Sequence, residues 1–256
     1  KESSAASDVY KRQAANYAEA VLANSSFSLA STAMDFSKNW VAGSSSPEII
    51  FAYVNNSRAS SPLNFTLYVN DTDGSWNYAP SDWCYSSLFA DDNTLSRKGD
   101  VRLKATFTSQ DANRVIKYPN GTYQLAETSD YTCTPVVISR ISEMYLVKAE
   151  ALGKTNGAAA LVEYMKKRYT TAPSEAAIKA LSDKEYQTLI LDERRREFYA
   201  EGMRWQDIKR TNRLELLETL DGRTYLMYYP IPQDEIDMAG TVAYPQNPGY
   251  AGYTGN

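Results

Sequence analysis

The densest group of residues that could do chemistry lies in the segment DERRREFYAEGMRWQDIKR, at 192–210. Glu193, Glu197 and Glu201 recur at every fourth position, which places their carboxylates on one face of a predicted helix. Glycoside hydrolases use two carboxyl groups as acid and base, and one of them must stay protonated. Arginines surround these glutamates, and nearby positive charge lowers the pKa of a carboxyl group. The carboxylates are therefore expected to stay ionised.

The charged side chains of this segment favour a structural role over a catalytic one. Pairs of opposite charge at positions i and i+4 support a helix and fix its register. Acidic residues alternate with the basic ones, which argues against a nucleic-acid surface. The residues assigned to a structural ion-pair network are Glu193, Arg194, Glu197, Glu201, Arg204 and Asp207.

Absent residue types narrow the chemistry further. The 256 residues include no histidine, the commonest general base and metal ligand. Two cysteines, Cys84 and Cys133, are too few for a metal cluster, and their spacing leaves open whether they pair. The segment NDTDGSW is no calcium loop, because aligning its glycine puts Val69 and Pro80 at ligand positions. We predict no enzyme activity, no metal and no cofactor.

An aromatic-rich loop is the segment best suited to binding. The chain has 20 Tyr and four Trp, and between 55 and 83 the sequence shows no clear helical or strand periodicity. Sugar rings stack their C–H faces on aromatic planes while their hydroxyls bond to amides and carboxylates, so such a loop suits a glycan. The predicted glycan-binding residues are Trp76, Tyr78, Trp83, Tyr85, Asn77 and Asp73. The alternative, that these rings only cover a helical layer, stays open.

Hydrophobic periodicity predicts the elements that position these groups. Helices are expected at 8–24, 33–40, 81–89, 140–152, 158–168, 184–200 and 203–211, and strands at 48–54, 102–108 and 114–118, the last two as a hairpin. Ser182 and Glu185 predict a capping box. The small residues Ala149, Ala151 and Ala159 suggest helix crossings, as in αα-hairpins stacked like tetratricopeptide repeats.

The predicted organisation is a single unit over 1–256. It has a helical start at 8–40, a loop-rich part with short strands at 48–135, a helical core at 140–212 and an extended tail at 223–256 that lies over the body. The formal net charge of −4 offers no general attraction to nucleic acid or to an anionic membrane surface. No apolar run approaches the roughly 20 residues that cross a bilayer.

Five short segments follow one another in a recognisable order. They are SPEIIF (46–51), RISEMYLVKAEAL (140–152), LDERRREFYAEGMRWQDIKR (191–210), YPIPQDEID (229–237) and QNPGY (246–250). The first two are weak signals, whereas the last three in series are specific. The series resembles the SusD/RagB family of nutrient-binding lipoproteins. The resemblance covers nearly all of this chain but only the later part of a typical member, so the usual N-terminal helical segment is expected to be missing.

The resemblance implies a mostly α fold, in which tetratricopeptide-like helix pairs carry an irregular loop and β-hairpin subdomain. It implies a protein on the extracellular face of the outer membrane, held by a lipid anchor that this chain lacks. Such a protein binds an oligosaccharide without catalysis and delivers it to a SusC-like TonB-dependent transporter. The family's aromatic arc is not part of the shared motifs, so the aromatic residues named above rest on the loop argument alone.

Two alternatives stay open beside glycan capture. One is the same transporter lid with peptide or other cargo, which a groove with exposed strand edges would favour. The other is a helical-repeat scaffold that binds only protein, which a buried aromatic loop would favour. An enzyme ranks last, since no serine or cysteine stands in a nucleophile context and the carboxylates have arginine neighbours.

Overall fold

The structure is a computed structural model that describes residues 2–41, 45–54, 79–107, 115–117, 135–217, 222–239 and 245–251, without the side chains of 2–7. The fold is mostly helical, as predicted. The chain divides into two compact units, Lys1–Glu201 and Gly202–Asn256. The organisation predicted from the sequence, a single unit over 1–256, stays a prediction.

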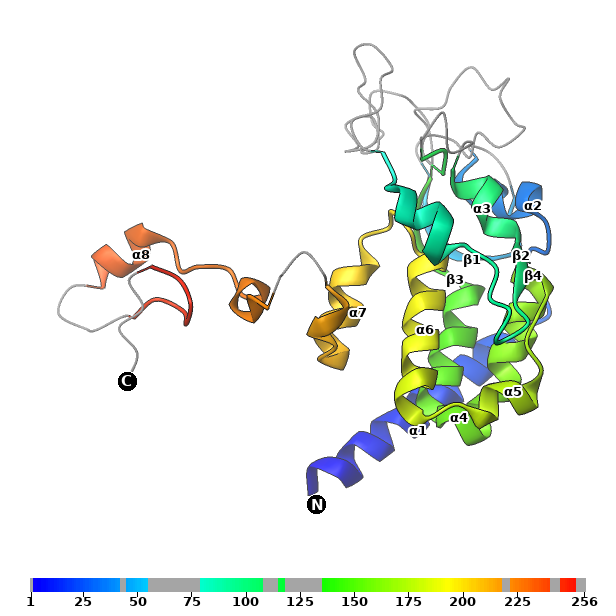
Figure 1. Ribbon diagram of the computed structural model, residues 1–256, viewed down its shortest axis with the longest axis horizontal. Coiled ribbons are helices and arrows are strands. Elements are labelled where there is room, and N and C mark those ends of the chain that lie inside the picture. The colour runs from blue at the N-terminus through cyan, green and yellow to red at the C-terminus, as the bar shows by residue number, and fades with distance from the viewer. Residues whose placement is uncertain are drawn as a thin grey trace, which may run out of the picture. The chain divides into compact units, whose positions relative to one another are not determined.

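Among the described residues, the larger unit holds most of the helices and all of the paired strands. Its helices are α1 (Glu2–Leu22), α2 (Ala33–Ser37), α3 (Val101–Thr106), α4 (Ile141–Arg168), α5 (Glu175–Ala180) and α6 (Asp183–Glu197), with a 3-10 turn at Lys38–Trp40 and a π-turn at Cys84–Leu88. Strands β1 (Ile49–Tyr53) and β3 (Val136–Arg140) pair antiparallel, as do β2 (Lys98–Asp100) and β4 (Tyr169–Thr171). Both α1 and α6 pack against α4 (Figure 1).

Helix α4 is a helical hairpin that reverses at Gly153. This glycine has φ 66° and ψ 175°, outside the helical region. The Tyr145 hydroxyl donates to Glu163 Oε1 over 2.9 Å. A straight helix would hold these two residues about 27 Å apart, at 1.5 Å per residue. The sequence therefore predicted the two helices of this pair correctly, although their assignment to tetratricopeptide repeats stays a prediction.

The two arms of the hairpin meet at small residues. Ala149, Gly157 and Ala158 are all buried. A Cβ added to Gly157 would lie 2.2 Å from the carbonyl oxygen of Ala149, closer than real atoms approach. The Tyr186 hydroxyl of α6 donates to the same carbonyl over 2.9 Å. Ala159, predicted at a crossing, is exposed instead.

Helix α6 begins as the sequence predicted but ends earlier. Ser182 Oγ accepts from the Glu185 amide at 3.2 Å, and Glu185 Oε2 accepts from the Ser182 amide at 2.7 Å, which completes the capping box. The helix stops at Glu197, and Ala200 adopts a left-handed φ of 65°. Glu201 therefore lies beyond the helix and does not share the helical face of Glu193 and Glu197.

The strand predicted at 102–108 was wrong, because this segment forms α3. Asp100 caps the helix by accepting from the Arg102 amide over 2.9 Å. Polar residues at 102, 104 and 106 imitate strand alternation, yet Arg102 and Thr106 are fully buried. In the described part, the predicted hairpin is reduced to one isolated bridge between Phe107 and Val115.

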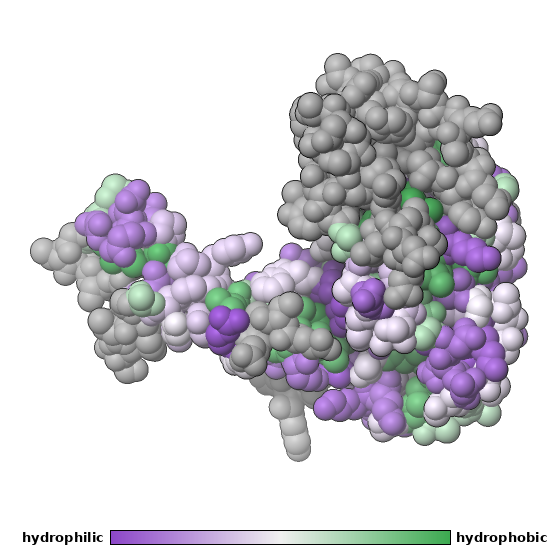
Figure 2. Space-filling view, turned by 45° about the horizontal axis from the view of Figure 1, so that its top comes forward, coloured by the Kyte–Doolittle hydropathy of each residue, from purple (hydrophilic) through white to green (hydrophobic). Residues whose placement is uncertain are grey.

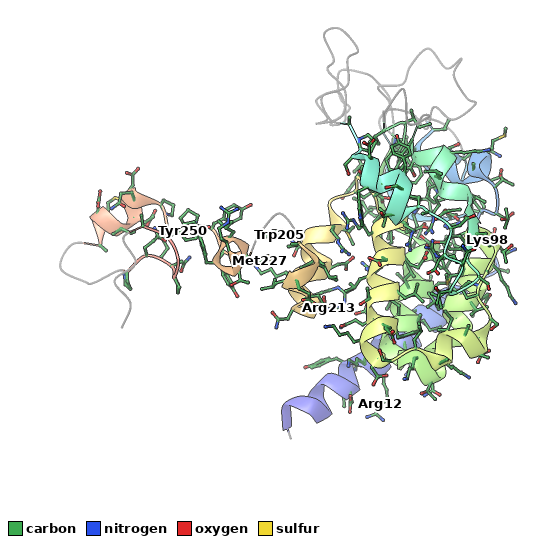
Figure 3. The ribbon with its side chains drawn as sticks, in the orientation of Figure 1. Arg12, Lys98, Trp205, Arg213, Met227 and Tyr250 are labelled. Carbon is green, nitrogen blue, oxygen red and sulfur yellow. The ribbon has the colours of Figure 1, made fainter. Side chains whose placement is uncertain are left out.

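The smaller unit contains short helices, two of them within 223–256, where the sequence predicted an extended tail. It contains α7 (Met203–Thr211), α8 (Gln233–Met238) and 3-10 turns at Leu214–Leu216 and Thr224–Met227. The side-chain amide of Gln246 accepts a hydrogen bond from the Ile231 amide at 2.7 Å and donates one to the Ile231 carbonyl at 2.8 Å. Tyr250, labelled in Figure 3, donates to the Tyr228 carbonyl over 2.6 Å. The segments YPIPQ and QNPGY are thus paired with each other.

Candidate functional site

Exposure alone does not single out a binding surface on this protein. Large apolar side chains are exposed on several elements of the described part. In Figure 2, hydrophobic residues are interspersed with hydrophilic ones over the visible face. Such scattering is normal for a folded protein. The predicted aromatic residues must therefore be considered one by one. Trp76, Tyr78, Asn77 and Asp73 lie outside the described residues, whereas Trp83 and Tyr85 lie inside them.

Trp83 lies on the surface and is held from one side. It directly precedes the π-turn Cys84–Leu88, and its relative solvent-accessible surface is 37%. The guanidinium carbon of Arg195, on α6, lies 4.2 Å from the centre of the indole ring. A cation over an aromatic face is attracted by the ring quadrupole. This contact fixes the orientation of an exposed ring, as a stacking platform requires.

Tyr85 is placed differently, with its ring turned into the unit. It packs on an apolar cluster of Cys84, Leu88, Phe89, Phe107 and Val115, and its ring centre lies 5.4 Å from that of Phe107. Its hydroxyl is buried and has no hydrogen-bond partner among the described residues. Burial raises the pKa of Tyr85. Tyr85 therefore anchors the turn that carries Trp83.

The only described cysteine supports the same anchoring. Cys84 is a buried free thiol, and its Sγ lies 3.3 Å from the hydroxyl of Tyr199. Cys133 lies outside the described residues. No group of three or more acidic or cysteine side chains that could hold a metal ion occurs among the residues that the structure describes.

Glu197 is the centre of a buried charge network. Its Oε2 accepts from Arg168 Nε at 2.9 Å and from the Tyr164 hydroxyl at 2.8 Å, and its Oε1 accepts from Arg168 Nη2 at 2.9 Å. Arg102 and Arg140 each approach the same carboxylate at 3.4 Å. These cations come from α3, α4 and β3, far from Glu197 in sequence. The network joins elements to one another, whereas the sequence had suggested pairs along one helix.

Glu193 forms a second node of the network. It accepts from Arg102 at 2.9 Å, from Arg196 at 2.8 Å and from the Tyr169 hydroxyl at 2.6 Å. Arg102 also binds Asp100 with two parallel hydrogen bonds, of 2.9 Å and 2.7 Å. Such bidentate pairs are the strong form of this interaction. Glu193 and Arg102 are fully buried, so this node is shielded from solvent.

The remaining predicted network residues lie at the edge of this cluster or outside it. Arg194 faces Glu143 at 3.5 Å. Asp207 pairs with Arg210 at 2.9 Å in the smaller unit, which also contains Arg204. Sequence reasoning missed the arginines of the core, Arg102, Arg140 and Arg168. Their local sequences, VRLKAT, VVISR and MKKR, do not distinguish them from surface arginines.

The buried carboxylates are poor candidates for acid–base catalysis. The pKa values of Glu193 and Glu197 are lowered, although burial alone would raise them, because arginines surround both groups. Both carboxyl groups are therefore ionised at neutral pH. With no exposure, they are also out of reach of a substrate. They join α3, α4, α6 and β3 to one another inside the larger unit.

Lys117 adds a charge whose protonation depends on pH. Its ammonium donates to the carbonyls of Glu197 and Tyr199, each at 3.0 Å, and to the carboxylate of Glu201. Arg140 donates to the other oxygen of Glu201 at 2.6 Å. Burial lowers the pKa of Lys117 to about 8, and the attraction of Glu201 offsets this effect only in part.

Between pH 8 and 10 the unfolding free energy is expected to rise relative to that of a Lys117→Met variant, by about 2 kcal/mol. The unfolded chain keeps the lysine pKa near its ordinary value of 10.5, so it binds more protons than the folded chain over this window. Comparing the variant removes the opposing effect of Tyr164 and Tyr169, whose pKa values are raised. Urea unfolding at each pH gives the difference. A pH-independent difference would contradict this assignment.

The described helices give no sign of a membrane span. None of them is both long enough and apolar enough to cross a bilayer.

Comparisons with known proteins agree with this architecture. The model of the SusD family matches residues 72–223. SusD-like protein P38 of Formosa agariphila is 30% identical over 142 residues, which are 50% of this chain and 27% of that protein. The chain thus spans only part of the length of its relatives.

Solved structures share the fold. A SusD superfamily protein from Bacteroides thetaiotaomicron matches with a TM-score of 0.62 and 24% identity, over 93% of this chain and 57% of that one. Surface glycan-binding protein A from the same organism matches with a TM-score of 0.58 and 19% identity, over 95% and 60%. A SusD-like carbohydrate binding protein from Bacteroides vulgatus matches with a TM-score of 0.55 and 20% identity, over 79% and 42%. Because the SusD family model matches more than half of the chain, the chain belongs to the SusD family.

Proposed function

We propose that this protein binds glycans at the cell surface and passes them to a TonB-dependent outer-membrane transporter, without breaking a bond. The observation that carries the proposal is Trp83, an exposed indole held in place by Arg195. The names of two similar structures, a carbohydrate binding protein and a surface glycan-binding protein, support the same cargo class. Family membership supports an outer-membrane location.

The geometry of Trp83 suits reversible capture. Arg195 approaches one face of the indole, and the exposed part of the ring remains available for the C–H face of a sugar. Polar side chains around it, including exposed Ser81 and Asp82, can bond to hydroxyl groups. A carrier must release its cargo, so modest affinity is expected. Trp76, Tyr78, Asn77 and Asp73 belong to the proposed site on the sequence argument alone.

A peptide cargo is the second candidate, and the β1–β3 pair favours it. Phe51 and Tyr53 on β1 are 48% and 61% exposed, and Ile138 on β3 is 53% exposed. The described sheet has only these two strands, so each has an edge that is unpaired within it. Extended peptides bind by adding a strand to such an edge, with their side chains on exposed apolar residues.

A Trp83→Ala variant is expected to lose glycan affinity by at least about tenfold. A Trp side chain that a ligand covers at a binding hot spot contributes more than ~1.4 kcal/mol to the binding free energy. A glycan array would identify a ligand, and calorimetry would compare the two proteins. The matched control is Trp205→Ala, because Trp205 is 36% exposed and lies in the smaller unit.

The outcomes separate the candidates. Equal losses in both variants, or a changed circular dichroism spectrum, would indicate a general effect on folding. Undiminished glycan affinity in Trp83→Ala would place the glycan site elsewhere. Binding of extended peptides with no response to any glycan would favour the peptide cargo.

A further inference from the structure

A pocket of about 530 Å³ lies in the larger unit, and neither Trp83 nor Arg195 lines it. One wall is the turn at 92–97, which precedes β2. The other wall is the linker at 181–182 together with the first part of α6. The volume falls within the range of small-molecule sites, roughly 300–1,000 Å³. The pocket is therefore a cavity of ligand size that is separate from the surface around Trp83.

The charges that line this pocket balance one another. Its three carboxylates and three cations are those of Asp92, Glu185, Asp192, Arg97, Lys184 and Arg196. An anionic ligand would face the three carboxylates, and a cationic ligand would face the three cations. A net charge on the ligand therefore brings no net attraction, and the lining favours a neutral ligand.

Most of these charged groups are already engaged within the protein. Asp92 Oδ1 accepts from two backbone amides of its own turn, at 2.9 Å and 3.1 Å. Glu185 Oε2 accepts from the Ser182 amide at 2.7 Å, in the capping box of α6. Arg196 donates to Glu193 at 2.8 Å. What the lining offers a ligand is thus single hydrogen bonds, with little unpaired charge.

Both walls keep a donor and an acceptor open. On the turn, the Thr94 hydroxyl and Asp92 Oδ2 have no hydrogen-bond partner among the residues that the structure describes. On α6, the same holds for the Lys184 ammonium and Glu185 Oε1 within the described part of the chain. A hydroxyl group both donates and accepts, so it can bond to either wall. A ligand with several hydroxyl groups matches this arrangement best.

The pocket also has an apolar part. The side chains of Leu95, Leu181 and Leu189 line it, from the turn, the linker and α6. Apolar lining with a few convergent polar groups is typical of ligand sites. Hydroxyl groups around an apolar C–H face are the composition of a sugar ring.

We propose that this pocket is a second saccharide site, selective for a neutral sugar unit. The inference rests on the proposed function for the saccharide class and on the pocket for the preference for a neutral unit. Sugar hydroxyls bond to Asp92 and Thr94 on one wall and to Lys184 and Glu185 on the other, while the leucines contact the C–H face. The sugar is held without any bond being broken.

Single sugars test this preference, by saturation-transfer NMR and calorimetry on the Trp83→Ala variant, in which the first surface is disabled. Methyl glucoside and methyl galactoside are the neutral probes, their uronates are the anionic counterparts, and the 2-amino sugars are the cationic ones. At least one neutral glycoside is expected to bind about threefold or more tightly than its charged counterparts, because a charged group loses hydration there without net attraction. Raising NaCl from about 50 mM to about 500 mM should change its affinity less than about twofold, since no ion pair with the ligand is screened.

A variant that fills the mouth of the pocket locates the site. Thr94→Tyr places a ring there and is expected to abolish binding of the neutral glycoside. Asn93→Tyr is its matched control, since Asn93 is the exposed neighbour in the same turn and does not line the pocket. Circular dichroism of both variants shows whether the fold is kept.

A pair of substitutions at Lys184 separates hydrogen bonding from charge. Lys184→Met removes the donor and is expected to weaken binding about threefold to tenfold, the scale of one hydrogen bond. Lys184→Gln removes the charge but keeps a donor, so it should retain most of the affinity. Lys166→Met, exposed on α4, is the control and should leave binding unchanged.

Three results would overturn the proposal. They are charged sugars that bind as tightly as the neutral glycosides, undiminished binding in Thr94→Tyr, and no binding of any probe sugar. Binding of glycylglycine in place of a sugar would also reject it and indicate a zwitterionic ligand.

The second site and the proposed function can fail independently. If Trp83→Ala loses array binding while Thr94→Tyr changes nothing, the proposed function is supported and the second site is rejected. If Thr94→Tyr loses sugar binding while Trp83→Ala binds every glycan normally, the pocket is supported and the Trp83 surface is rejected.

Discussion

An Arg168→Met variant is expected to lose about 3–5 kcal/mol of unfolding free energy, the range for removing one partner of a buried ion pair. Arg168 is fully buried and donates to both oxygens of Glu197 at 2.9 Å. It also lies 2.8 Å from Glu48 and donates to the Ala30 carbonyl over 2.7 Å. Methionine fills a similar space but leaves two buried carboxylates without their main cation.

Thermal unfolding followed by circular dichroism measures this loss. A unit of this size loses roughly 2–4 °C in Tm per kcal/mol, so the variant should melt on the order of 10 °C lower. Arg12→Met is the matched control, because Arg12, labelled in Figure 3, is exposed on α1. If both variants lost less than about 1 kcal/mol, Arg168 would be no more important than a surface charge.

A Gly157→Val variant is expected to be destabilised by about 3 kcal/mol or more, at the upper end of the cost of overpacking. A Cβ at this position meets the Ala149 carbonyl oxygen at 2.2 Å and the Tyr186 hydroxyl at 2.9 Å. Neither can move freely, since the Tyr186 hydroxyl is hydrogen-bonded to that same carbonyl. The two arms of α4 would have to separate.

The control separates this clash from helix propensity. Ala159→Val introduces the same side chain two positions later, on the exposed face of α4. It should cost only the lower helix propensity of valine, about 0.5 kcal/mol. Urea unfolding of both variants gives the comparison. Equal losses would mean that close approach of the two arms is not what requires glycine at 157.

Local signals in the sequence predicted much of the helical core. The capping box of Ser182 and Glu185 and the two arms of α4 were predicted from neighbouring residues, and both are present. The series of short segments pointed to the SusD family, which the family match confirms. Each of these features depends on residue types within a few positions, so a single sequence carries enough information.

Features that depend on distant contacts were missed. Residues 102–108 alternate like a strand, yet Arg102 is buried against Tyr164, Tyr169 and Glu193, which lie 62, 67 and 91 positions away, and the segment forms a helix. The partners of Glu197 lie 29, 57 and 95 positions away, at Arg168, Arg140 and Arg102. Spacing along a helix cannot reveal them. Of the predicted binding residues, Trp83 is exposed and Tyr85 packs into the unit, a difference in burial that the sequence does not show.

The distances along the chain within the charge network also bear on how fast the protein unfolds. Arg168 bonds to a carbonyl 138 positions away, and Arg102 to a carboxylate 91 positions away. Such contacts require closure of long loops, so they form after local helices in folding. Interactions that form after the transition state change mainly the unfolding rate. We expect the contacts of this network to form late in folding, so that weakening them shortens the lifetime of the folded state and changes the folding rate little.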